Sequence, residues 1–421
     1  MHLISIIICY TILMSFLLGQ GAMNAFGLGH FYHNQGIVSA ANGINDLVPA
    51  FQDKISLSNP STWQNLKYTH LSLSYSGDKN SFSNPSLINE YSGLSSAYWI
   101  VPIKTKWSFG LSITPYADQR ISINQSNDNT FIAFGDTLNL VNSIKRAGGI
   151  MSFKVGTSFL AWEKLSLGIS LDLLFGSSRQ SELLFFDGSA IIQSSRTLYT
   201  GTLNNFYMAS QFDNNNFYIS FMYPTNPLDG LYTERHLFDD SNGNGHHDYG
   251  IPADFPFPDS VTAENEERIF NIHKPTQLSF GYQTKLEKLA TFSIEASSFI
   301  DRGDPTQITL PINDWIDESN QIKLSITRFP NDLSLDLIDK FSFRIGIVGK
   351  SHNLAGSGMN VAEVGGALGI GFKFKLTGNQ IDLNYYHGKR DYSETYDTEN
   401  IQQIQIGVSL ADLWFVKRRQ K

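Results

Sequence analysis

Short segments in which apolar and polar residues alternate make up most of the chain. Near the C-terminus, Ile404, Ile406 and Val408 lie on one face of an extended segment, and glutamine, glycine and serine lie on the other. A strict period of two is typical of a β-strand whose two faces meet different surroundings. Helical periodicity is nearly absent, so the sequence predicts an all-β protein. The same alternation recurs in LSLSY, FGLSITP, FKVGTSF, LSLGISLDLLF, FYISFMY, LSFGY, FSIEA, FSFRIGI, LGIGFKFKL and IDLNYYH.

The apolar face of these segments meets either the core of a soluble β-sandwich or membrane lipid. Many segments are near the roughly ten residues that a tilted strand needs to cross a bilayer. Aromatic residues gather at segment ends, where the interface girdles of membrane barrels lie; they are Tyr75, Trp107, Trp162, Tyr223 and Trp414. Because backbone groups in lipid must all pair internally, such a sheet has to close. We therefore predict a transmembrane antiparallel β-barrel, with a secreted sandwich as the alternative.

The polar faces carry a few charged residues among glycine, serine and asparagine. These are Lys154, Asp172, Glu295, Arg344, Lys373, Lys375 and Asp382. In a barrel they face the lumen, because the residues that alternate with them face lipid.

The number of strands follows from the alternating segments. There are about thirteen clear candidates, and QRISINQ and IKLSITR are ambiguous. Bacterial single-chain barrels have an even number of strands, so we predict about 14 within residues 67–416. The connections in LAWEKLSLG and KLTGNQIDL are short and predict periplasmic turns. Outer loops are expected at 119–148, 177–194, 226–273 and 301–340, and the acidic, proline-rich 226–273 is the largest excursion.

The N-terminus begins with the apolar run LISIIICYTILMSFLLG, followed by the small and polar QGAMNA. This pattern predicts a signal peptide over residues 1–25 with cleavage after Ala25, and an uncleaved anchor helix is the alternative. The single cysteine, Cys9, lies inside that run, so the mature chain would contain no disulfide. Residues 26–66 are rich in small side chains, and we expect them to plug the barrel lumen as a hatch or to hang in the periplasm.

Three stretches resemble one family of membrane proteins. SLSNPSTW, with Asn59, Pro60 and Ser61, is similar to the "NPA" element of the long-chain fatty-acid transporter (FadL-like) outer-membrane family. GLSSAYWIVPIKTKWSFGLSITPYAD resembles the early strands of that family. IQIGVSLADLWFVKRRQK resembles the closing strand of its members from Bacteroidetes-type bacteria. Together these stretches cover roughly a third of the chain.

The resemblance implies a 14-stranded barrel in the outer membrane of a Gram-negative-type bacterium. It also implies an N-terminal hatch with Asn59, Pro60 and Ser61 as its motif, and passage of a hydrophobic ligand. The chain departs from the family in having Ser61 in place of alanine and a basic tail over 417–421. Trp414 and Phe415 are then expected to replace the terminal aromatic that the barrel assembly machinery recognises. Outer-membrane lipids are the other expected partner.

A polar loop, DDSNGNGHHDYG, resembles a calcium-binding loop. Asp240, Asn242, Asn244 and Asp248 fall at positions 1, 3, 5 and 9 of an EF-hand-like spacing, and His246 offers its backbone carbonyl. Position 12 is isoleucine, so the usual bidentate glutamate is missing. We expect either a structural Ca²⁺ site of modest affinity or a solvated loop without an ion. No cofactor is expected to be required.

Other chemistry finds less support in the sequence. The formal charge of −8 gives no basic footprint, so nucleic acid is not an expected partner. Glycines in GGALGIGFKF lie within a strand pattern and do not open a helix, which argues against a phosphate loop. No motif joins a nucleophile to a base, and we predict that the protein is not an enzyme. A serine or aspartate hydrogen-bonded to a histidine at the rim would favour one; the candidates by residue type are His70, Ser72, His273 and His387.

The leading hypothesis for function is therefore transport of hydrophobic, fatty-acid-like small molecules across the outer membrane. The alternative is a non-transporting barrel that acts as a scaffold or anchor in type IX-like protein secretion, because fold alone does not separate these roles. A tightly filled lumen and long ordered outer segments would favour the scaffold. An apolar cavity that reaches a break in the barrel wall would favour transport.

Overall fold

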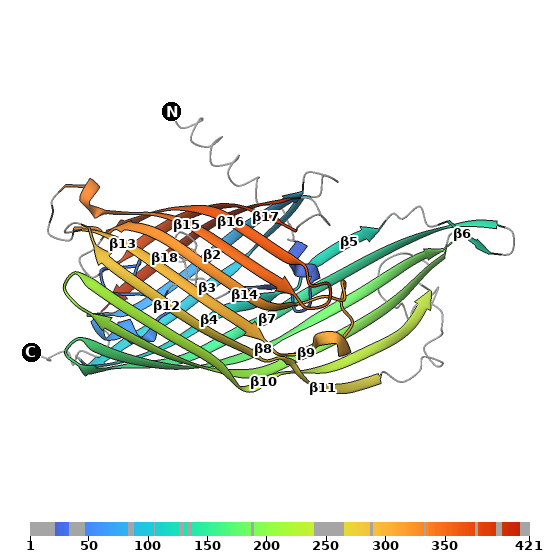
Figure 1. Ribbon diagram of the computed structural model, residues 1–421, viewed down its shortest axis with the longest axis horizontal. Coiled ribbons are helices and arrows are strands. Elements are labelled where there is room, and N and C mark those ends of the chain that lie inside the picture. The colour runs from blue at the N-terminus through green and yellow to red at the C-terminus, as the bar shows by residue number, and fades with distance from the viewer. Residues whose placement is uncertain are drawn as a thin grey trace, which may run out of the picture.

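One antiparallel sheet closes on itself to form the body of the protein (Figure 1). The computed structural model describes residues 22–32, 47–82, 88–104, 106–125, 130–133, 136–186, 189–239, 265–286, 289–331, 334, 336–374, 378–392 and 398–412. The barrel closes because the last strand, β18 (Glu399–Asp412), pairs with the first long strand, β2 (Thr69–Phe82). The closed sheet confirms the predicted 14-stranded barrel and rules out the sandwich.

The remaining wall strands follow in chain order. They are β3 (Ile88–Lys104), β4 (Trp107–Asp118), β7 (Asp136–Trp162), β8 (Leu165–Phe186), β9 (Ser189–Gln211), β10 (Asn215–Asp239), β12 (Pro275–Lys285), β13 (Ala290–Asp301), β14 (Ile316–Arg328), β15 (Phe341–Leu354), β16 (Asn360–Lys373) and β17 (Gln380–Asp391). The short strands β5 (Ile121–Gln125) and β6 (Thr130–Ala133) pair with the outer part of β7, and β11 (Asn265–His273) pairs with the outer part of β10.

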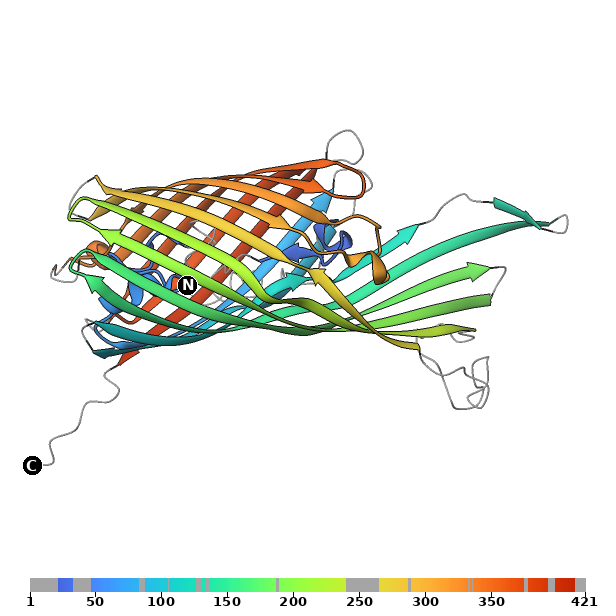
Figure 2. The same ribbon diagram turned by 60° about the horizontal axis from the view of Figure 1, so that its bottom comes forward.

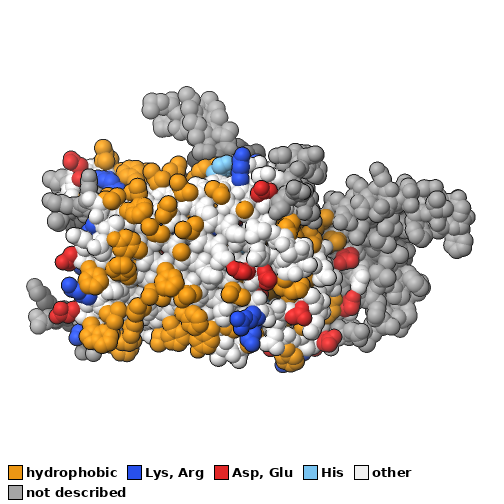
Figure 3. Space-filling model, in the orientation of Figure 1, with side chains coloured by type: hydrophobic (Ala, Val, Ile, Leu, Met, Phe, Trp, Pro, Cys, Tyr) orange, Lys and Arg blue, Asp and Glu red, His pale blue; other side chains and the backbone are white. Residues whose placement is uncertain are grey.

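Alternation along each strand separates a lipid face from a lumen face. On β2, Leu73 is 49% exposed on the outside, whereas the neighbouring Ser72 and Ser74 are buried inside. Figure 3 shows hydrophobic side chains spread over the barrel wall and charged ones gathered toward its two ends. Trp107 and Trp162, both exposed, lie beside the short connections between strands, as expected of an interface girdle.

Strands β7 to β10 extend far beyond the rest of the barrel (Figures 1 and 2). They contain 22 to 27 residues each, against 11 to 14 for β12 to β18. The loops predicted at 119–148 and 177–194 are therefore wrong, because those residues mostly form β5, β6 and the outer parts of β7, β8 and β9. In the region 226–273, the flanks belong to β10 and β11, and residues 240–264 lie outside the described part. In the region 301–340, β14 forms a complete wall strand, so IKLSITR is a strand.

Short 3₁₀ helices accompany the barrel: η1 (Ala22–Ala25), η2 (Pro60–Asn65), η4 (Pro305–Gln307) and η5 (Ile338–Lys340). A two-residue strand, β1 (His30–Phe31), pairs with β4. Among the described residues, no helix is long and apolar enough to cross a membrane.

Oppositely charged side chains pair inside the barrel. Lys154 lies directly across from Asp172 in the register of β7 and β8, with Nζ 3.6 Å from the carboxylate. Glu295 and Lys323 face each other in the same way across β13 and β14, 3.9 Å apart. All four side chains are nearly inaccessible to solvent. These residues occupy the predicted polar face, and their pairing offsets the cost of burying charge.

Candidate functional site: a plugged lumen beside a break in the wall

The N-terminal part of the chain lies inside the barrel. We call residues 22–32 the outer lobe and residues 47–66 the inner lobe of the plug. In the inner lobe, Asn59 caps η2: its side-chain oxygen accepts from the backbone N–H of Ser61 at 3.0 Å and from the Ser61 hydroxyl at 2.7 Å. Pro60 follows at the first helical position, which suits its fixed φ. The predicted hatch motif thus forms a buried, capped turn within the lumen.

Three glycines in the barrel wall make room for this turn. Gly110 on β4, Gly156 on β7 and Gly168 on β8 all face η2. A Cβ added at Gly168 would lie 2.5 Å from the backbone nitrogen of Ser61, and one at Gly110 would lie 2.7 Å from the Trp63 ring. Only glycine therefore lets the wall approach the turn this closely.

Charged lumen residues also hold the inner lobe. The Glu295 carboxylate accepts from the backbone N–H groups of Leu47 and Val48, each at 3.5 Å. Arg344 donates to the backbone carbonyl of Ala50 at 2.9 Å, and its guanidinium also binds Asp382 at 2.7 Å. The buried ions therefore bind the plug as well as each other.

We expect Asn59→Ala to loosen the inner lobe by about 1 kcal/mol, because η2 loses its N-cap. The substitution also removes the hydrogen bond from the Asn59 amide to the Leu47 carbonyl at 2.8 Å. Hydrogen exchange of the backbone amides over 47–66 should then be several-fold faster. Asp304→Ala, which removes the matching cap of η4 outside the plug, should leave that exchange unchanged. Equal exchange in both variants would contradict the capping role.

Hydrogen bonds from side chains to backbone carbonyls hold the outer lobe at the mouth of the barrel. Arg146 donates to the Gly27 carbonyl at 2.6 Å, and the Asn24 amide donates to the Arg120 carbonyl at 2.9 Å. Gly27 and Gly29 both have positive φ, of 50° and 85°, and each passes too close to the wall for a side chain. Because Met23, Asn24 and Ala25 are buried here, they are part of the plug in this structure, and cleavage after Ala25 stays a prediction.

The barrel wall has a break between β3 and β4. The two strands pair only over Ala97–Lys104 and Trp107–Ile113. The outer end of β4 instead pairs with β1 of the plug, with Phe31 opposite Ala117, and the Tyr32 N–H binds the Tyr116 carbonyl at 2.9 Å. Figure 2 shows the outer lobe, in dark blue, between the outer end of the light-blue strands and β5. The plug therefore fills the position in the wall that β3 leaves open.

A buried histidine anchors this part of the plug. His273 Nδ1 is hydrogen-bonded to Asp301, and its Nε2 lies 2.7 Å from the Tyr116 hydroxyl. The Phe31 ring stacks on the imidazole, with centroids 4.9 Å apart. An aspartate–histidine pair was the sign that would favour an enzyme. Here both ring nitrogens are engaged and the ring face is covered, so the geometry fits an anchor between β4, β11, β13 and the plug.

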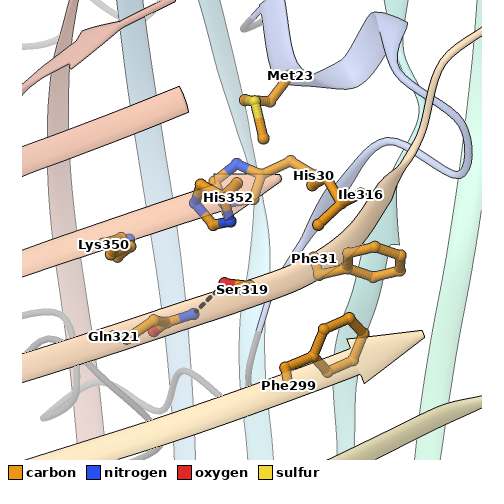
Figure 4. A pocket seen from close by; sticks show the side chains of 9 residues that line it. All are labelled: Met23, His30, Phe31, Phe299, Ile316, Ser319, Gln321, Lys350 and His352. Atoms are coloured by element: carbon orange, nitrogen blue, oxygen red, sulfur yellow. Dashed lines mark hydrogen bonds between the residues drawn. The ribbon is translucent and has the colours of Figure 1, made fainter. Parts of the chain in front are cut away.

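A narrow pocket, partly open to solvent and with enclosed room for about one water molecule, lies between the outer lobe and the strands β13 to β15. Its lining combines apolar side chains with a basic side (Figure 4), and comprises Met23, His30, Phe31, Phe299, Ile316, Ser319, Gln321, Lys350 and His352. Desolvation inside the barrel lowers the pKa of His30 well below its usual value, and the charges of Arg390 and Lys350 act in the same direction. Neutral His30 thus adds a polar but uncharged group.

Most of the other predicted site residues lie outside the described part of the chain. Asp240, Asn242, Asn244, His246 and Asp248 lie outside the described residues, so calcium binding stays a prediction. The same holds for Trp414, Phe415, the basic tail and Lys375. His70 and Ser72 are buried in the lumen on β2, where the Ser409 hydroxyl donates to Ser72 at 2.8 Å. His387 lies on exposed positions of β17, away from both.

Comparison with known proteins places this chain in a family. The family model BamG matches residues 2–421. The chain belongs to the BamG family. This BamG-family chain is a closed barrel with an apolar outer face, as predicted for an outer-membrane protein. No curated protein sequence matches it.

Solved structures share the fold at low sequence identity. The CymD monoaromatic hydrocarbon channel matches with a TM-score of 0.58 and 13% identity, over 93% of this chain and 100% of that chain. The P. putida toluene transporter TodX matches at 0.57 and 14%, over 91% and 99%. A Pseudomonas aeruginosa FadL homologue matches at 0.55 and 12%, over 93% and 98%. These matches confirm the FadL-like barrel fold for this BamG-family member, and two of the matching proteins are named as a channel and a transporter.

Proposed function

We propose that this barrel passes hydrophobic small molecules from the outer face into the membrane through the break between β3 and β4. The observation that carries the proposal is the position of the pocket. Phe31 belongs both to the pocket lining and to β1, which closes the break. Phe31 alone therefore separates a molecule in the pocket from the break in the wall.

The surroundings of the pocket suit an apolar molecule. Phe26, Leu28 and Phe31 of the outer lobe belong to one buried cluster with side chains from β8 to β16. An apolar surface of this kind lowers the free energy of a hydrophobic solute that crosses polar headgroups and water. The Lys350 ammonium and the two histidines supply a polar end for orientation, so we propose fatty-acid-like or other amphipathic molecules as the substrate class.

Filling the pocket tests this proposal. Ser319→Phe adds a ring beside Phe31 and Phe299, and overpacking of a closed site costs about 1–3 kcal/mol. Uptake of a fluorescent fatty acid by cells should therefore fall about tenfold or more. The control is Ser297→Phe, at a buried lumen position on β13 that does not line the pocket. Folding of both variants is checked by heat-modifiable migration on gels. Equal uptake with and without the wild-type protein would contradict transport.

A second candidate function is a scaffold that works with other outer-membrane proteins. Membership of the BamG family supports an association with the barrel assembly machinery. The inner lobe fills part of the lumen, and strands β7 to β10 form an extended, ordered outer surface. Both features also support a non-transporting role, because a scaffold needs an ordered outer surface and no passage. A role as an anchor in protein secretion would use the same surface.

Depletion of the protein separates the two candidates. If the protein is a scaffold in barrel assembly, its depletion should lower the amounts of other folded barrels in the outer membrane. Uptake of the fluorescent fatty acid, divided by the amount of barrels that remain, should be unchanged. Ser319→Phe should then restore assembly as well as the wild type does. The transport proposal predicts the reverse: depletion lowers uptake and leaves the amounts of other barrels unchanged, and Ser319→Phe fails to restore uptake.

A further inference from the structure

Three exposed cations meet on the outside of the extended strands. Arg179 on β8 lies directly opposite Arg196 on β9 in the strand register. Lys145 on β7 lies opposite Ser181, the next residue on the same face of β8 as Arg179. Directly opposite side chains have Cβ atoms about 5 Å apart, and diagonal ones about 7–8 Å apart. We call Lys145, Arg179 and Arg196 the basic patch.

The basic patch lacks counter-ions within the part of the chain that the structure describes. None of its three side chains makes an ion pair or hydrogen bond there. Its register neighbours on the same face are small and uncharged. They are Ala147 opposite Arg179, Ser122 opposite Lys145, Ser181 and Ser194 opposite each other, and Thr233 opposite Arg196. The next acidic position in the Arg196 row is Glu266, two strands away on β11.

Like charges directly opposite each other destabilise a sheet. Arg179 and Arg196 form such a pair on an exposed surface, where most other residues would be tolerated. An arrangement that costs stability and lacks a partner in the chain points to an anion from outside. Guanidinium groups favour phosphate, because their planar fork donates two parallel hydrogen bonds to its oxygens.

The position of the patch identifies the source of that phosphate. On β8, the lipid-facing side chains Ile169, Leu171, Leu173 and Phe175 are each between 38% and 46% exposed. This apolar row ends at Phe175, and Arg179 follows four residues later on the same face. The extended strands lie at the end opposite the short turns, which is the outer side of such barrels. At about 3.3 Å per residue along a tilted strand, Arg179 lies about 10 Å beyond the hydrocarbon region.

We propose that Lys145, Arg179 and Arg196 bind the phosphate groups of a phosphorylated glycolipid in the outer leaflet. The acyl chains of that lipid would cover the exposed row from Ile169 to Phe175, and its headgroup phosphates would lie between the two guanidinium groups. Leu198, which is 37% exposed and two residues from Arg196, extends the apolar contact on β9. The site is independent of whether the lumen transports a solute.

The test measures binding of diphosphoryl lipid A to the purified, detergent-solubilised full-length barrel by native mass spectrometry. Arg179→Gln combined with Arg196→Gln should raise the Kd about tenfold or more, because each cation near an anionic lipid contributes about 1 kcal/mol. Arg179→Lys combined with Arg196→Lys keeps both charges and should lose less. Heat-modifiable migration shows that each variant is folded.

Matched controls separate this site from general attraction by positive charge. The pair Arg302→Gln and Lys389→Gln removes two other exposed cations, at the β13 end and on β17, and should leave the Kd unchanged. An equal loss of affinity in both double variants would overturn the proposal. So would equal binding of dephosphorylated lipid A. Full displacement by millimolar inorganic phosphate would show a site for the free anion and would also overturn it.

Discussion

Replacing Arg390 with methionine is expected to lower the free energy of unfolding of the barrel by about 3–5 kcal/mol. The Arg390 guanidinium lies inside the barrel, 2.7 Å from Glu363 and 2.8 Å from Glu399. Lys350 and Tyr386 also bind Glu363, at 2.9 Å and 2.6 Å. Without the arginine, two buried carboxylates lose the charge that compensates both of them. Denaturant unfolding in lipid vesicles, followed by tryptophan fluorescence, measures the effect.

The matched control is Arg328→Met. Arg328 also binds a carboxylate, that of Asp339 at 2.6 Å, but both side chains are about 30% exposed. Water screens such a pair, so we expect a much smaller change. In the Arg390→Met background, Glu399→Gln should restore part of the lost stability, because it removes one of the uncompensated charges. Equal effects of Arg390→Met and Arg328→Met would show that the buried network contributes no more than a surface pair.

The second large effect is expected from Gly168→Leu. The new Cβ would lie 2.5 Å from the Ser61 nitrogen and 2.9 Å from the Pro60 carbonyl carbon, which are backbone atoms of the capped turn. The inner lobe must therefore move away from β8. An overpacking cost of about 1–3 kcal/mol corresponds to a roughly 5- to 150-fold larger undocked population. Protease cleavage within 47–66 should be faster by a similar factor, and the ionic conductance of planar bilayers should rise.

Gly366→Leu is the control for this substitution. Gly366 lies on the exposed face of β16, where an added Cβ would meet only a backbone oxygen at 3.9 Å. Cleavage and conductance should match those of the wild type. The Gly168→Leu barrel could instead fold and resist cleavage like the wild type. That result would show that the wall glycines facing η2 do not determine the position of the plug.

The wall of the barrel was predictable because lipid and lumen impose opposite demands on neighbouring residues. Leu71, Leu73 and Tyr75 alternate with serines, and this alone gives the strand and its outward face. For the outer parts of β8 and β9, which lie beyond the lipid, the sequence predicts a loop instead of strands. There both faces are polar, as in SSRQSE and SSRT, and the alternation that marks a strand disappears.

The partners of the lumen charges were not predictable from alternation. The period of two gives the face on which Glu295 and Lys323 lie, but their contact depends on the register of β13 against β14. Likewise, Asp301 and His273 are 28 positions apart and meet because His273 lies just before Pro275, which is opposite Asp301 in the register of β12 and β13. The Asn59-Pro60-Ser61 motif is predicted by its resemblance to the NPA element of the FadL-like family, and the structure shows that it is an N-cap followed by a proline. The break between β3 and β4 has no local signal of this kind.

The pairing of β2 with β18 also constrains how the chain enters the membrane. Ser409 and Ser72, which meet at this seam, are 337 positions apart. Contacts between such distant residues form slowly, because a very long stretch of chain must be ordered first. Until β18 arrives, β2 and β17 each present a row of unpaired N–H and C=O groups that hydrocarbon tolerates poorly. A nascent chain that stops short of Glu399 therefore leaves an open sheet, and its two unpaired edge strands can pair with other chains.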